Sequence, residues 1–133
     1  MYEEFGVFKA EVQLLIELRQ YDNTFKKLMI RINNGKDKTI LEKNFLDRAM
    51  ALIHYYKGNI SMAKQYINAA INNIELLDAA GNYNIARSLN LMTYIEIYGA
   101  ELNCEERKSI IKQIEYYQGK NLPGDMEGLS YGI

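Results

Sequence analysis

The segment YYKGNISMAKQYINAAI, residues 55–71, places a glycine and two alanines at intervals between large apolar side chains. Gly58 follows a pair of tyrosines, and Ala63 and Ala70 come five and twelve residues after it. A glycine in the left-handed conformation is a common end to a helix, and small side chains let two helices approach closely. The segment therefore predicts the turn and the second helix of a tightly packed helical hairpin.

Similar signals divide the rest of the chain. A glycine follows each of five stretches with helical periodicity, where a left-handed residue would end a helix: Gly35, Gly58, Gly81, Gly99 and Gly119. The residues expected to cap helix starts are Thr39, Ser61, Asn82 and Asn103. Thr39 and Asn103 are each followed three residues later by a glutamate, the pattern of a capping box. These signals give both ends of most helices.

The resulting prediction is an all-α fold of six helices, over residues 3–20, 23–33, 40–57, 61–79, 83–98 and 104–118. No segment alternates apolar and polar residues as a half-buried strand would. Short connections make consecutive helices antiparallel, which gives hairpins over residues 3–33, 40–79 and 83–118. We expect one domain over residues 1–118, followed by a glycine-rich tail over residues 119–133.

Composition excludes several classes of function. The chain has 16 Lys and Arg against 17 Asp and Glu, a formal charge of -1, so we expect no direct binding to nucleic acid. No run approaches the roughly 18–20 apolar residues of a membrane span, and the acidic N-terminal segment differs from a signal peptide. Cys104 is the only cysteine, which excludes an internal disulfide and is typical of a reducing compartment. These features predict a cytoplasmic protein.

The hairpin over residues 40–79 resembles a tetratricopeptide repeat, whose pattern has a small residue in helix A, a turn glycine, and A-x3-F-x2-A in helix B. Here these positions are occupied by Ala51, Gly58, Ala63, Ile67 and Ala70. A weaker copy follows over residues 81–118, with its turn glycine 41 residues after the first. The resemblance implies hairpins stacked as a short right-handed superhelix with a concave inner face.

The 41-residue spacing of the two turn glycines exceeds the 34-residue period of a standard repeat, and the excess lies in a long second helix. The passage ELLDAAGNYNIARSLNLMTYIEIYG, residues 75–99, is similar to the lengthened repeats of bacterial peptide-responsive regulators, the Rap, PlcR, NprR and AimR group. That resemblance implies recognition of a short signalling peptide in the concave groove, with roles in quorum sensing and transcription regulation. Such regulators carry a DNA-binding helix-turn-helix, which we do not find in this sequence, so the resemblance leaves two roles open: pairing with a larger regulator, or being the peptide-sensing part of one.

Two polar and aromatic stripes are the candidate peptide-binding or partner-binding residues. A groove for an extended peptide uses amides, charges and aromatic rings to hold the peptide backbone and side chains. The stripes lie on the helices over residues 40–57 and 83–98, and consist of Asn44, Arg48 and Tyr55 on the first and Arg87, Asn90 and Tyr94 on the second. The alternative is that both stripes are solvated helix faces.

No arrangement of residues points to catalysis, so we expect the protein not to be an enzyme and to hold no metal or cofactor. His54 is the only histidine, and it is better explained by helix packing than by metal binding or acid–base chemistry. Cys104 near a helix start is more simply a small packing residue than a reactive thiol.

The sequence leaves two functions open. The first is a binding module for a short peptide or a segment of a partner protein. The second is a structural protein that oligomerises through its terminal helices. The helix over residues 3–20 is apolar for a terminal helix, whereas the helix over residues 104–118 has the polar outer face of a cap.

Overall fold

The computed structural model describes residues 4–37, 39–78 and 80–119, and these contain six α-helices, one short 3-10 helix and no strand. The predicted all-α fold is confirmed. In chain order the helices are α1 (Phe5–Glu17), α2 (Tyr21–Asn34), α3 (Ile40–Tyr56), α4 (Ile60–Leu77), α5 (Asn84–Tyr98), η1 (Gly99–Glu101) and α6 (Cys104–Gly119). Residues 120–133 of the expected tail lie outside the described residues.

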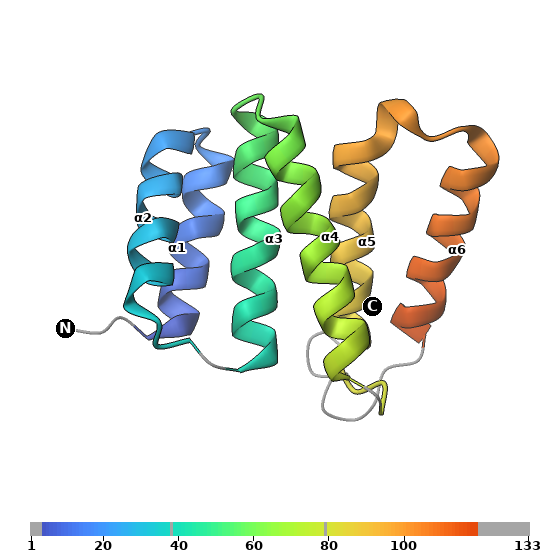
Figure 1. Ribbon diagram of the computed structural model, residues 1–133, viewed down its shortest axis with the longest axis horizontal. Coiled ribbons are helices and arrows are strands. Elements are labelled where there is room, and N and C mark those ends of the chain that lie inside the picture. The colour runs from blue at the N-terminus through green and yellow to red at the C-terminus, as the bar shows by residue number, and fades with distance from the viewer. Residues whose placement is uncertain (1–3, 38, 79, 120–133) are drawn as a thin grey trace.

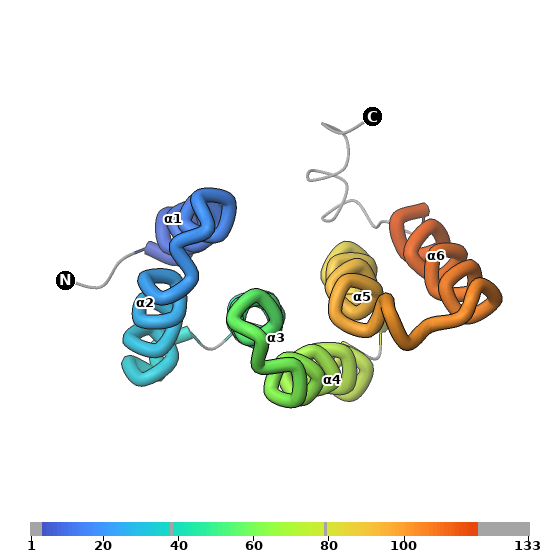
Figure 2. The backbone as a smooth tube through the Cα atoms, turned by 90° about the horizontal axis from the view of Figure 1, so that it is seen from above, coloured from blue at the N-terminus to red at the C-terminus, as the bar shows by residue number. Residues whose placement is uncertain are grey.

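The six α-helices form a single row, with α1 and α2 together at one end, α3, α4 and α5 in the middle and α6 at the other end (Figure 1). Each α-helix contacts the next along the chain, and α3 also contacts α5. Viewed from above, the helices follow an arc, with α1, α3 and α5 on its inner side and α2 and α4 on its outer side (Figure 2). The inner side is therefore built from the first helix of each expected hairpin.

Two apolar clusters hold this row of helices together, and α3 belongs to both. The first cluster joins α1, α2 and α3, and contains Phe8, Val12, Leu28, Phe45, Leu46, Ala49, Met50 and Ile53. The second joins α3, α4 and α5, and contains Ala51, Ala63, Ile67, Ala70 and Ile97. The three alanines have 0% exposed surface. The close helix contact predicted from their spacing is confirmed.

The prediction of a left-handed glycine after a helix is confirmed at three of the five positions. Gly35, Gly58 and Gly81 have φ angles of 64°, 86° and 71°, in the left-handed region that favours glycine. The prediction is wrong at Gly99, whose φ of -50° is right-handed and leads into η1. The turn there ends instead at Leu102, which is extended. Gly119 is the last residue of α6.

Both capping boxes are confirmed. The Glu42 amide donates to Thr39 Oγ1 at 3.1 Å, and the Thr39 amide donates to Glu42 Oε1 at 3.2 Å. At α6 the Glu106 amide donates to Asn103 Oδ1 at 2.8 Å, and the Asn103 amide donates to Glu106 Oε1 at 3.0 Å. Each pair satisfies two amides that a helix start leaves without partners.

The other two predicted caps are wrong. Ser61 lies inside the first turn of α4, which begins at Ile60, and no side-chain cap is present there. Asn82 lies before the start of α5, in a turn organised by a different side chain. The Asp78 carboxylate accepts the amides of Asn82 and Tyr83, both at 2.7 Å. The buried Asp78, which directly follows α4, thus satisfies the amides at the start of α5 in place of a local cap.

Candidate ligand-binding groove

A groove of about 590 Å³ runs along the inner side of the arc, between the first halves of α1, α3 and α5. Its α1 wall consists of Phe5, Gly6 and Lys9, and its α5 wall consists of Tyr83, Ile85, Ala86 and Leu89. The floor comes from α3 and the residue before it: Thr39, Leu41, Glu42, Asn44, Phe45 and Arg48. The volume is that of a site for a small ligand or a few peptide residues.

Most of the groove surface is apolar. Leu41 on the floor is 49% exposed, and Leu89 on the α5 wall is 36% exposed, so both present aliphatic surface to the groove. The Lys9 ammonium lies 5.7 Å from the centre of the Phe45 ring. Apolar walls with a few polar groups are typical of ligand sites in proteins.

A cluster of three polar side chains lies where α3, α4 and α5 meet, and we call it the polar junction: Asn44, Arg48 and Asn90. Arg48 Nη1 donates to Asn44 Oδ1 at 2.7 Å and to Asn90 Oδ1 at 3.0 Å. The amide groups of Asn44 and Asn90 donate to the Ala70 carbonyl oxygen of α4, at 3.1 and 3.4 Å. The polar junction therefore ties three helices together around one guanidinium.

Arg48 is the charged member of the polar junction, and no described acidic side chain forms an ion pair with it. Its guanidinium carbon lies 6.0 Å from the centre of the Phe45 ring, and the rest of its side chain is partly buried. Burial lowers the pKa of the Arg48 guanidinium to about 10. The group still has its positive charge at neutral pH, without the carboxylate that normally accompanies a buried arginine.

The structure brings together three of the six residues singled out in the sequence. Asn44 and Arg48 line the groove, and Asn90 reaches them from α5. The alternative left open in the sequence, solvated helix faces, does not describe Asn44 and Asn90, because they are only 4% and 1% exposed. Their amides are buried in bonds between helices.

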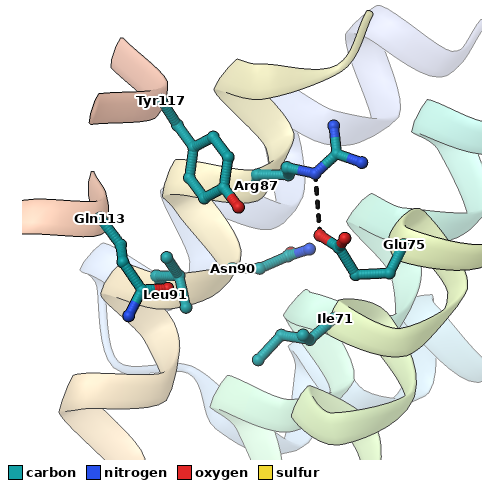
Figure 3. Close-up of a pocket in the computed structure, with 7 residues that line it drawn as sticks. All are labelled: Ile71, Glu75, Arg87, Asn90, Leu91, Gln113 and Tyr117. Atoms are coloured by element: carbon teal, nitrogen blue, oxygen red, sulfur yellow. Dashed lines mark hydrogen bonds and ion pairs between the residues drawn. The ribbon is translucent and has the colours of Figure 1, made fainter. Parts of the chain in front are cut away.

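Arg87 points away from the groove, into a smaller hollow of about 210 Å³ between α4, α5 and α6 (Figure 3). Its Nε donates to Glu75 Oε1 at 2.8 Å, and its Nη1 donates to Asp78 Oδ2 at 2.6 Å. The Tyr117 ring of α6 lies against it, with 5.8 Å between the ring centre and the guanidinium carbon. Unlike Arg48, Arg87 has its charge balanced by two carboxylates.

The two predicted tyrosines lie outside the groove lining. Tyr55 and Tyr94 both pack against the second apolar cluster, and the Tyr94 ring stacks on Tyr98 with centres 4.2 Å apart. The groove residues that the sequence did not single out are mainly apolar, such as Leu41 and Leu89. Helical periodicity places these leucines on a helix face, but only the neighbouring helices decide that the face borders a groove.

The other two residues considered in the sequence, His54 and Cys104, are not part of the groove lining. His54 is 8% exposed, and its ring stacks on Tyr66 with centres 5.5 Å apart. The interpretation of Cys104 as a packing residue is wrong, because Cys104 is exposed at the start of α6. Over residues 4–37, 39–78 and 80–119, no three His, Cys, Asp or Glu side chains are grouped as a metal site would require. None of the helices in those ranges has the length and apolar character of a membrane span.

Comparison with known proteins does not assign this chain to a family. No family model, curated protein or solved structure matches this chain.

Proposed function

We propose that the protein is a non-catalytic, cytoplasmic binding module of the tetratricopeptide type, which holds a short peptide or a segment of a partner protein in its inner groove. The observation that supports this most directly is the groove itself, which three non-consecutive helices line on the inner side of the arc. In a stack of helical hairpins, that side offers the extended concave surface that binds other chains.

The chemistry of the groove favours a peptide over a small polar metabolite. Exposed aliphatic surface at Leu41 and Leu89 offers contacts to apolar side chains, and the buried apolar area stabilises such complexes. Only a few polar groups reach the groove, which is the usual way a site fixes the orientation of its ligand.

The similarity of residues 75–99 to bacterial peptide-responsive regulators supports a more specific proposal. In this proposal the ligand is a short signalling peptide used in quorum sensing, and the chain acts on transcription regulation by pairing with a larger regulator. The fully buried Ala51, Ala63 and Ala70 support the repeat geometry that such a role requires.

The test is a binding experiment with peptide pools and two matched variants. Pools of random hexapeptides are added to the whole chain, and backbone amide shifts are followed by NMR. Leu89→Glu places a charge in the groove, whereas Leu76→Glu makes the same change at a residue that is 79% exposed on α4 and outside the groove lining. We expect shifts along α1, α3 and α5 that Leu89→Glu abolishes and Leu76→Glu preserves.

Two results would contradict the proposal. The first is that none of the pools shifts a groove resonance at millimolar peptide concentration. The second is that a pool binds equally well to both variants, because the peptide would then lie elsewhere on the surface.

A second candidate function is assembly through α1. Val7, Leu14 and Leu18 are 49%, 54% and 57% exposed. Their spacing places Val7 and Leu14 on one face of α1 and Leu18, the residue directly after the helix, at the end of that face. Exposed apolar stripes of this kind often mark contacts between proteins. Light scattering of the wild type and of the double variant Leu14→Lys, Leu18→Lys tests this function. A wild-type oligomer that becomes a monomer in the variant supports assembly, and a wild-type monomer contradicts it.

A further inference from the structure

We infer that Arg48 is the anchor for an acidic side chain, an aspartate or a glutamate, of the peptide that occupies the groove. The inference rests on the proposed function, because it names the chemistry that the groove would select. It has three supports: the free edge of the guanidinium, the charge balance of the groove, and the position of Arg48 between the two walls.

The hydrogen bonds of the polar junction determine which nitrogens of the Arg48 guanidinium have no partner among the described residues. Both hydrogen bonds of Arg48 come from Nη1, to Asn44 and Asn90. Among the described residues, Nε and Nη2 have no hydrogen-bond partner. These two nitrogens form the side of a guanidinium that binds both oxygens of a carboxylate at once. The two asparagines thus hold the guanidinium through Nη1, and its carboxylate-binding edge has no hydrogen-bond partner among the described residues.

The charge of the groove also favours an acid. Arg48 and Lys9 line the groove, and neither forms an ion pair with a described acidic side chain. Among the described lining residues, Glu42 is the one acid, and it is held in the capping box with Thr39. A partly buried cation without a counter-ion is costly, so a carboxylate that pairs with it is stabilised. The groove is therefore complementary to a negatively charged group.

The position of Arg48 indicates which carboxylate it binds. Arg48 belongs to α3, which lies between α1 with Lys9 and α5 with Leu89 along the arc, and all three residues line the groove (Figure 2). A peptide that lies across the three helices passes over Arg48 and projects a side chain onto it. With Leu41 and Leu89 nearby, the expected ligand has an acidic side chain flanked by apolar ones.

The experiment uses the whole chain and three pools of hexapeptides that share the same apolar and Ser positions. Two pools are N-acetylated and C-amidated, so their ends have no charge, and they differ only in having Glu or Gln at one fixed position. The third has the Gln sequence with a free C-terminal carboxylate. Binding is measured by titration calorimetry to the wild type, Arg48→Gln and the control Arg107→Gln, which removes an exposed guanidinium from α6.

We expect the Glu pool to bind the wild type about 10- to 100-fold more tightly than the Gln pool, the effect of a charge-assisted pair of hydrogen bonds. Arg48→Gln should remove that difference, and Arg107→Gln should keep it. Arg48→Lys, which retains the charge but loses the planar fork, should keep only part of the preference. Circular dichroism of each variant checks its folding, and Arg48→Lys provides the comparison if Arg48→Gln unfolds.

Each alternative outcome has a distinct meaning. Equal binding of the Glu and Gln pools overturns the inference and leaves the proposed function standing. Tighter binding of the third pool alone, lost in Arg48→Gln, overturns the choice of a side chain in favour of a chain end. No binding of any pool overturns the proposed function and the inference together.

Discussion

Arg87 Nη1 lies 2.6 Å from Asp78 Oδ2, and this buried ion pair joins the end of α4 to the first turn of α5. Burial by itself would raise the pKa of the Asp78 carboxyl, but the amides of Tyr83 and Asn82 and the Arg87 guanidinium hold that pKa below its ordinary value. The carboxylate therefore stays charged at neutral pH, and it fixes the turn only while its partners remain.

Replacing Arg87 with methionine should destabilise the protein strongly. The change leaves the Asp78 charge buried with one partner fewer, a situation that typically costs about 3–5 kcal/mol. Arg107→Met is the matched control, because Arg107 is exposed and donates to the Gly99 carbonyl oxygen at 2.7 Å. Its cost should stay below about 1 kcal/mol. Urea unfolding followed by circular dichroism measures both, and equal losses would contradict the structural role of Arg87.

The close contact between α3 and α4 gives a second prediction. Ala63 has 0% exposed surface, so a leucine there must push the two helices apart. Overpacking of this kind costs about 1–3 kcal/mol. Ala10→Leu makes the same change at an exposed position of α1, where the effect should lie within about 0.5 kcal/mol. Thermal unfolding of both variants checks the difference. A stable Ala63→Leu variant would mean that the helices are less tightly packed than described.

The part of the fold that could be predicted from sequence is the part encoded by nearby residues. The glycine at Gly58 and the alanines after it specify a hairpin within about twenty residues of chain. The capping box at Thr39 is likewise local, because its two partners are three residues apart. The prediction of a cap at Asn82 is wrong because the amides there are bound by another side chain. The Asp78 carboxylate accepts the hydrogen bonds that a local cap would otherwise satisfy.

In the groove, too, contacts within one helix could be predicted from the sequence, and contacts between helices could not. Asn44 and Arg48 are one helical turn apart, so their pairing is visible in the sequence. Asn90 completes the polar junction from 42 residues away, and only the packing of α5 against α3 brings it there. The same packing turns Arg87, three residues before Asn90, toward α4 and α6. Periodicity gives the face of each helix but not the neighbour that covers it.

Protonation of His54 gives a pH-dependent prediction. Burial, and then the nearby positive charge of Lys57, lowers the pKa of His54 from its ordinary value of 6.5. The unfolded chain therefore binds a proton more readily, and the free energy of unfolding should fall as the pH drops below about 7 through the folded-state pKa. His54→Phe keeps a ring against Tyr66 and removes this dependence. Urea midpoints at pH 8, 7, 6 and 5 check it, and parallel curves for the two proteins would contradict it.

Asp47 should behave in the opposite way, because burial raises the pKa of its carboxyl despite a hydrogen bond from Asn73. Its charge is penalised in the folded state, so the wild type loses stability as the pH rises from 3.8 through the folded-state pKa. Asp47→Asn has no charge to bury, and its thermal midpoint should exceed that of the wild type at pH 7 and equal it near pH 3.

Asp22→Asn is the control for Asp47→Asn. Asp22 is exposed, and its hydrogen bond with Lys57, together with the lysine charge, lowers the pKa of its carboxyl. Removing that charge should leave the midpoint at pH 7 unchanged or slightly lower, because exposed ion pairs contribute little. A rise in both variants would indicate a general effect of net charge. A rise in Asp47→Asn alone would assign the penalty to the burial of this one carboxylate between α3 and α4.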